Sequence, residues 1–76
     1  METIGQNDLV ALLVDFPQQG LQRGDVGTVL EVFEANEHHP AGYLVEFLDE
    51  ETGNWIELDI TDSSQIVLLN FKRLAA

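Results

Sequence analysis

Proline and glycine divide this chain at short intervals, and short apolar runs lie between them. The dividing residues are Pro17, Gly20, Gly24, Gly27, Pro40, Gly42 and Gly53. The runs between them are rich in Val, Ile, Leu and Phe, and none has a sustained helical period. This pattern predicts several short strands joined by turns.

Five strands and one tight turn are predicted along the chain. The strands cover about residues 9–15, 26–34, 43–48, 54–60 and 66–70. Pro17 is expected to end the first strand, because proline lacks the N–H that a ladder requires. The segment TDSSQ (61–65) predicts a tight or 3₁₀ turn, since Asp and Ser side chains bond to nearby backbone. With 76 residues, we expect a single domain, 1–76, that forms a small closed or half-closed barrel after a flexible N-terminus (1–7).

The stretch LQRGDVGTVLEV (21–32) has two glycines three residues apart. Gly24 is expected to close the loop after the first strand with a positive φ, and Gly27 to allow a bend or bulge at a barrel corner. Asp25 between them is expected to bond to backbone within the turn. These structural roles account for the motif without a ligand.

The alternation in the third and fourth strands predicts how they pair. Core faces coincide when Phe47 lies opposite Ile56, which places Glu46 opposite Glu57 and Leu48 opposite Trp55. Residues 50–53 then form a four-residue loop in which Gly53 takes a positive φ.

This register creates an outward face that carries apolar and acidic side chains together: Leu44, Glu46, Leu48, Trp55, Glu57 and Asp59. Like charges directly opposite each other on a sheet are mildly destabilising. One interpretation is that the C-terminal FKRL folds over the face, so that Lys72 or Arg73 reaches the carboxylates. The other is a protein-binding patch, with an aromatic anchor and a polar rim suited to a basic partner.

Charge excludes several partners. Fourteen acidic residues oppose three basic ones, giving a formal net charge of −11. Because Lys and Arg carry most of the affinity for phosphates, we expect no binding to nucleic acid or to an anionic membrane. The absence of cysteine fits a reducing cytoplasm, and neither a secretion signal nor a membrane-spanning run is present.

No group of residues predicts catalysis, a cofactor or a metal. His38 and His39 are adjacent and are better interpreted as a solvated loop tip than as ligands. The segment DEETGN (49–54) lacks the spacing of a calcium loop and predicts an acidic hairpin turn. Glu46 and Glu57 lie on a convex face, where acid–base chemistry lacks a pocket. We expect a protein that is not an enzyme.

The segments NDLVALLVDFP, GLQRGDVGTVLEV and YLVEFLDEETG resemble a small bacterial family of domains of unknown function. Its members read N-D-x-V-x-L-x-x-D-x-P, then L-x-x-G-D-x-G-T-V, then V-E-F-x-D, and the resemblance covers residues 7 to about 60. It implies an SH3-like barrel with an opening element like that of KOW domains. No catalytic residues are defined for that family, so the resemblance assigns none to this chain. The longer connection EANEHHPAG and the segment after Ile60 depart from the family pattern.

The sequence therefore predicts an acidic, cytoplasmic protein-binding module of the antitoxin or immunity type, which covers a basic site on a partner protein. An accessory subunit or adaptor that binds by adding a strand at a sheet edge is the alternative. A regulator of transcription or translation that acts through the KOW-like element is a third, and it requires RNA binding.

Overall fold

The computed structural model describes residues 3–69, which form five strands and two 3₁₀ turns. The strands are β1 (Leu9–Leu12), β2 (Val26–Phe33), β3 (Gly42–Leu48), β4 (Trp55–Ile60) and β5 (Ile66–Leu68), and the turns are η1 (Pro17–Gln19) and η2 (Ser63–Gln65). All neighbours are antiparallel in one sheet of order β4-β3-β2-β1-β5. The predicted all-β class and five-stranded, partly open barrel are confirmed. Among these residues, no helix has the length and apolar character needed to cross a membrane.

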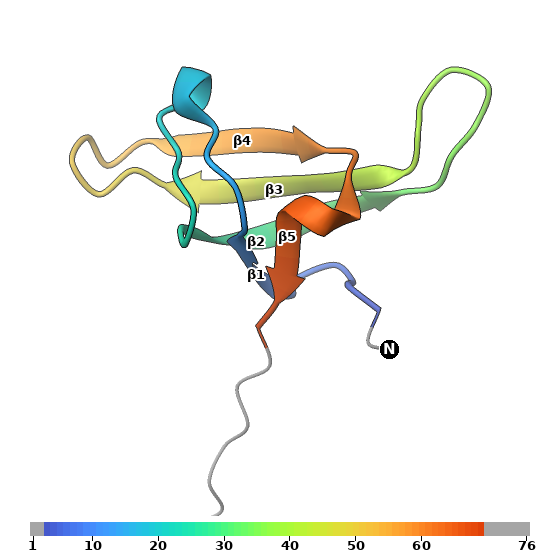
Figure 1. The fold of residues 1–76 in the computed structure, drawn as a ribbon, viewed down its shortest axis with the longest axis horizontal. Coiled ribbons are helices and arrows are strands. Elements are labelled where there is room, and N and C mark those ends of the chain that lie inside the picture. The colour runs from blue at the N-terminus through green and yellow to red at the C-terminus, as the bar shows by residue number, and fades with distance from the viewer. Residues whose placement is uncertain (1–2, 70–76) are drawn as a thin grey trace, which may run out of the picture.

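The sheet is strongly coiled. Strands β2, β3 and β4 lie side by side, whereas the short β1 and β5 run steeply across them (Figure 1). The connection through η2 brings the chain from β4, at one edge of the sheet, to β5 at the other. The sheet does not close, so within residues 3–69 β4 and β5 each have one edge without a neighbouring strand.

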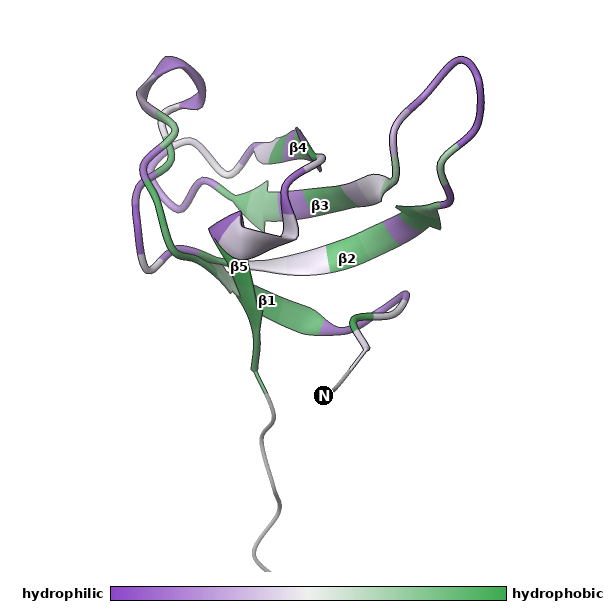
Figure 2. Ribbon diagram, turned by 45° about the vertical axis from the view of Figure 1, so that its right-hand side comes forward, coloured by the Kyte–Doolittle hydropathy of each residue, from purple (hydrophilic) through white to green (hydrophobic). Residues whose placement is uncertain are grey.

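The core lies on the concave side of this sheet. Nine buried side chains form it: Val10, Leu12, Leu21, Val29, Val45, Phe47, Leu58, Ile60 and Ile66. Figure 2 shows the apolar residues concentrated on the strands and the polar residues on the connecting loops. The alternation of the third and fourth strands predicts the core positions of Val45, Phe47 and Leu58 correctly.

The first strand ends earlier than the sequence predicts, at Leu12 rather than near residue 15. The loop that follows is folded back by long-range backbone bonds. Leu12 N–H donates to the Asp25 carbonyl at 2.9 Å, and Gly24 N–H donates to the Leu12 carbonyl at 2.8 Å. At the far end of the loop, Phe16 and Leu21 pair across η1. This pairing places Leu21 in the core, with 6% of its surface exposed.

The turn residues adopt the backbone that their types favour. Gly24 has a φ of 96° and Gly53 a φ of 76°, both in the region that disfavours a Cβ atom. Asp25 Oδ2 accepts a hydrogen bond from Gln22 N–H at 2.9 Å, within the turn that Gly24 forms.

Gly27 has a different role from the predicted bend. The bulge in β2 lies between Val29 and Glu31, while Gly27 pairs regularly with Val10 inside the ladder. A Cβ on Gly27 would lie 2.7 Å from the Phe47 ring and 2.7 Å from the Glu46 carbonyl oxygen. Glycine is therefore required because the largest core side chain packs directly against the backbone of β2.

Residues 4–8 contact the sheet. The sequence predicts a flexible N-terminus over residues 1–7, and part of that range is held in place. Ile4 packs against the core. Asn7 N–H donates to the Val29 carbonyl at 2.7 Å, and Val29 N–H donates back to the Asp8 carbonyl at 2.9 Å. These bonds hold Asn7 and Asp8 against Val29, directly before the start of β1. Met1 and Glu2 lie outside the described residues.

The predicted 3₁₀ turn in TDSSQ is present as η2. Asp62 caps it, because its Oδ1 accepts bonds from Ser64 Oγ at 2.6 Å and Ser64 N–H at 3.0 Å. The bond from the Ser64 hydroxyl, and then that from its N–H, lowers the pKa of Asp62 below 3.8. The strand that follows is Ile66–Leu68, shorter than the predicted 66–70.

Candidate functional site

The β3–β4 hairpin pairs in the predicted register. Phe47 faces Ile56, Glu46 faces Glu57, and Leu48 faces Trp55. Asp49 N–H donates to the Asn54 carbonyl at 2.8 Å, which leaves residues 50–53 as the loop. The six predicted site residues therefore share the outward face of the hairpin: Leu44, Glu46, Leu48, Trp55, Glu57 and Asp59. We call this set the hairpin face.

The apolar end of the hairpin face is open to solvent. Trp55 is 59% exposed and Leu48, opposite it, is 48% exposed. Trp55 begins the edge strand β4, which no strand among residues 3–69 flanks on its other side. Large aromatic side chains so exposed are the residues that most often anchor protein interfaces.

Carboxylates occupy the centre of the hairpin face. Glu46 lies between Glu57 on β4 and Thr28 on β2, and it is half-buried, whereas Glu57 is exposed. No lysine or arginine among residues 3–69 forms an ion pair with either glutamate. The pair therefore has the like-charge contact that the sequence predicts.

A feature that sequence reasoning missed lies at the other end of the hairpin face. The β2–β3 loop folds back so that His39 Nε2 is 3.5 Å from Asp59 Oδ2. The His39 ring also packs on Phe33, with ring centroids 5.1 Å apart. Asp59 nevertheless keeps 51% of its side-chain surface exposed, so both ends of the face reach solvent.

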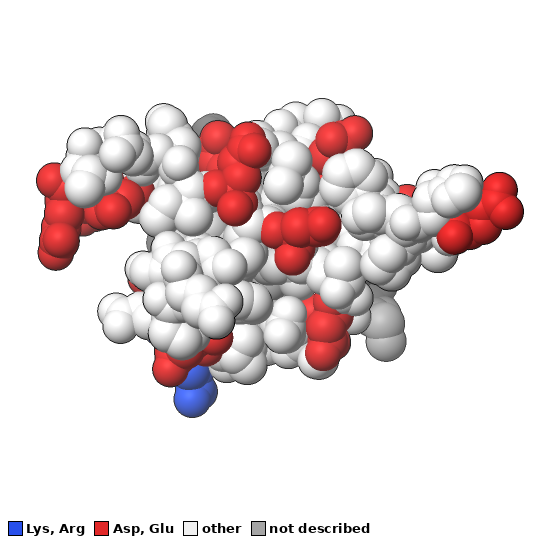
Figure 3. All heavy atoms as spheres, turned by 90° about the horizontal axis from the view of Figure 1, so that it is seen from above, with Lys and Arg blue, Asp and Glu red and all other residues white. Residues whose placement is uncertain are grey.

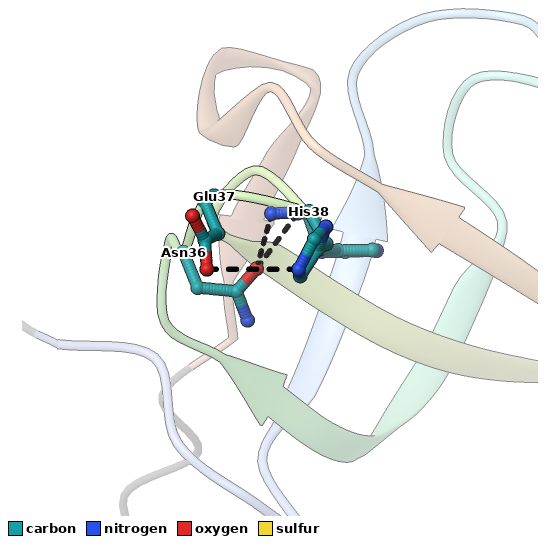
Figure 4. Close-up of polar contacts among 4 residues, drawn as sticks. Asn36, Glu37 and His38 are labelled. Atoms are coloured by element: carbon teal, nitrogen blue, oxygen red, sulfur yellow. Dashed lines mark hydrogen bonds and ion pairs between the residues drawn. The ribbon is translucent and has the colours of Figure 1, made fainter.

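Asn36 shapes this loop. Its Oδ1 accepts backbone N–H bonds from His38 at 2.7 Å and from His39 at 2.9 Å (Figure 4). His38 Nε2 lies 3.7 Å from the exposed Glu37 carboxylate, so the two histidines have different partners. In the part of the chain that the structure describes, no three histidine or acidic side chains gather as a metal site would require.

Negative charge covers much of the surface. Carboxylates are spread over the view in Figure 3, from one end of the molecule to the other. Arg23 is the only lysine or arginine between residues 3 and 69, and its backbone N–H donates to Asp15 Oδ1 at 2.8 Å. The sequence predicts that FKRL packs over the hairpin face. Residues 71–74, which include Lys72 and Arg73, lie outside those described.

Sequence reasoning also missed a groove beside the hairpin face. It has a volume of about 550 Å³ and lies between the residue 20–26 segment and the end of the β3–β4 hairpin. Leu48 lines it and also faces Trp55, so the groove and the open end of the hairpin face adjoin. The bonds of Leu12 to Asp25 and Gly24 fold the β1–β2 loop toward the hairpin. No periodicity in the sequence predicts these long-range bonds.

Comparison with known proteins identifies a family but no activity. None of the curated proteins or solved structures compared with the chain matches it. A family described as a domain of unknown function, DUF4926, matches residues 6–66, which include strands β1 to β4 and the first residue of β5. The chain therefore belongs to the DUF4926 family.

Proposed function

We propose that this domain is a non-enzymatic, acidic protein-binding module of the bacterial cytoplasm. It covers a basic site on a partner protein, in the manner of an antitoxin or immunity protein. The observation that carries the proposal is the exposed Trp55 beside Leu48, next to two carboxylates that have no lysine or arginine partner among residues 3–69.

The hairpin face contributes little to the stability of the domain by itself. Glu46 opposite Glu57 is an unfavourable pair, and an exposed tryptophan gains little from the folded state. A basic partner relieves both, because it neutralises the carboxylates while it removes the indole from water. A polyanion such as RNA would meet thirteen carboxylates and one arginine over residues 3–69. This charge disfavours the hypothesis of a regulator that binds RNA through a KOW-like element.

Affinity capture from the protein's own cells tests the proposal. The wild-type domain and the Trp55→Ala variant serve as parallel baits, and Val32→Ala is the control. Val32 is 42% exposed but pairs with Tyr43, on the opposite face of the sheet from Trp55. A protein retained by wild type and Val32→Ala but lost with Trp55→Ala supports the hairpin face. Retention of the same proteins by all three baits argues against it.

The open sheet supports a second candidate, an accessory subunit or adaptor that binds by strand addition. Strand β4 has six residues, and no other strand of the described part of the chain pairs with its outer side. A partner strand can pair there through backbone bonds, without any contribution from the indole. Binding of this kind survives Trp55→Ala, whereas binding through the hairpin face does not.

A further inference from the structure

The groove beside the hairpin face combines two kinds of surface. Its apolar floor comprises Val26, Leu48 and Ile56, which line the groove and are at least partly exposed. Asp49, Glu50 and Glu51 form part of its rim. At about 550 Å³, it has room for more than one side chain of a bound segment.

The rim is held in place by the turn between β3 and β4. Asp49 Oδ1 accepts from Glu51 N–H at 3.0 Å, and the Asp49 carbonyl accepts from Gly53 N–H at 2.7 Å. These bonds fix the backbone that carries Glu50 and Glu51. The ion pairs found among residues 3–69 both involve histidines of the β2–β3 loop, so neither uses a carboxylate of the rim.

We propose that this groove binds an arginine or lysine side chain from an extended basic segment of the protein partner. Such a side chain has an apolar stem and a charged head. The stem fits the floor at Val26 and Ile56, and the head reaches the carboxylates of the rim. The inference rests on the proposed function, because it specifies the chemistry of the same partner.

The rim and the floor disfavour other occupants. An anionic ligand such as a nucleotide meets Asp49, Glu50 and Glu51 at the entrance. A wholly apolar ligand leaves these carboxylates without a partner and partly removes them from water. A cationic, amphipathic side chain is the occupant that satisfies both surfaces.

The groove adjoins the Trp55 end of the hairpin face at one residue. Leu48 lines the groove, and it lies directly across from Trp55 in the β3–β4 ladder. A partner that covers the indole can therefore reach the groove past Leu48. Charge complementarity at the groove also favours a defined orientation of the partner on the hairpin face.

A peptide titration followed by backbone amide NMR tests the inference. The probe is a capped hexapeptide of alternating arginine and leucine, added to the full chain at low ionic strength. We expect shifts at residues 20–26 and 49–51. The double variant Glu50→Gln/Glu51→Gln should weaken binding by about three- to tenfold, because each rim contact is partly exposed.

Two controls test whether binding depends on the rim carboxylates and on the arginine side chains. Glu34→Gln/Glu37→Gln removes the same charge from two exposed positions of the β2–β3 loop. This control variant should bind the peptide with unchanged affinity. A peptide with glutamine in place of arginine should not shift residues 49–51. Equal weakening by both double variants, shifts away from the groove, or equal binding of the glutamine peptide would overturn the inference.

Failure of this inference is distinguishable from failure of the proposed function. If Trp55→Ala abolishes partner binding while Glu50→Gln/Glu51→Gln binds the arginine peptide like wild type, the groove assignment is wrong and the function stands. If the peptide occupies the groove while partner binding ignores Trp55→Ala, the groove stands and the hairpin face is not the interface.

Discussion

Glu46 and Glu57 lie directly opposite each other on β3 and β4, on the outward face of the sheet. Glu46 is half-buried and Glu57 is exposed, so the cross-strand repulsion is only partly screened by water. A domain with a net charge of −11 gains nothing for folding from this contact. Its presence beside an exposed tryptophan is the reason to propose binding at this face.

The variant Glu57→Lys should be more stable than wild type. It replaces a like-charge pair with an opposite-charge pair across the same ladder position, which is expected to add about 0.2–1 kcal/mol to the free energy of unfolding. Urea unfolding at neutral pH measures the change. Glu34→Lys is the matched control, since it changes net charge equally at an exposed position just beyond the end of β2. Equal stabilisation by both variants would assign the effect to overall charge.

The variant Gly27→Ala should destabilise the fold by about 1–3 kcal/mol, because the added Cβ would lie 2.7 Å from the Phe47 ring. Chemical denaturation measures the loss. Gly5→Ala is the control, since the new Cβ there would meet only Asp8 Oδ2, at an ordinary 3.7 Å. A Gly27→Ala variant as stable as Gly5→Ala would show that β2 and β3 are not packed as described.

The cap of η2 predicts a pH dependence. The pKa of Asp62 is lowered from 3.8 by its bonds from Ser64, so between the two values the unfolded chain binds more protons than the folded one. The stabilisation is fully present above about pH 4 and is lost as the pH falls through the folded-state pKa. Asp62→Asn keeps an acceptor oxygen but removes the charge.

Thermal unfolding of wild type and Asp62→Asn across this range measures the contribution. The variant should melt at a lower temperature near pH 7, and the difference should shrink as the pH falls below 3.8. Ser64→Ala should reproduce part of the effect, since it removes the hydroxyl bond and leaves the N–H bond. A difference that is constant with pH would contradict the charged cap.

The β3–β4 hairpin could be predicted from sequence because β4 alternates, and its core-facing residues must lie beside those of β3. A shift of one residue would have buried Glu57 and Asp59, so the hydrophobic pattern fixes which side chains point outward. Gly53 and the acidic loop then fix the turn. Every residue of the hairpin face follows from these constraints.

The groove and the His39 contact could not be predicted, because both depend on loops placed by distant partners. Leu21 reaches the core only because Leu12 bonds to Asp25 and Gly24 across the base of its loop. His39 approaches Asp59 only because Asn36 turns the β2–β3 loop back. Neither arrangement has a period or a spacing that local sequence patterns reveal. The role of Gly27 likewise depends on Phe47, twenty positions along the chain.

The hairpin face makes a joint prediction about affinity and salt. Binding of the captured partner should weaken at least tenfold between low and high ionic strength, because carboxylates at the rim of an interface are screened by salt. Glu57→Lys should weaken binding at low salt despite its greater stability. If neither added salt nor Glu57→Lys changes the affinity, charge does not determine recognition of the partner.

The most direct measurement is calorimetric titration of the purified partner with wild type and Trp55→Ala at two salt concentrations. A tryptophan that anchors an interface contributes about 2 kcal/mol or more, so Trp55→Ala should weaken binding by roughly thirtyfold at low salt. Raising the salt should weaken wild type further, and Val32→Ala should behave as wild type. Affinity that is unchanged by Trp55→Ala and flat with salt would contradict the hairpin face as the binding site.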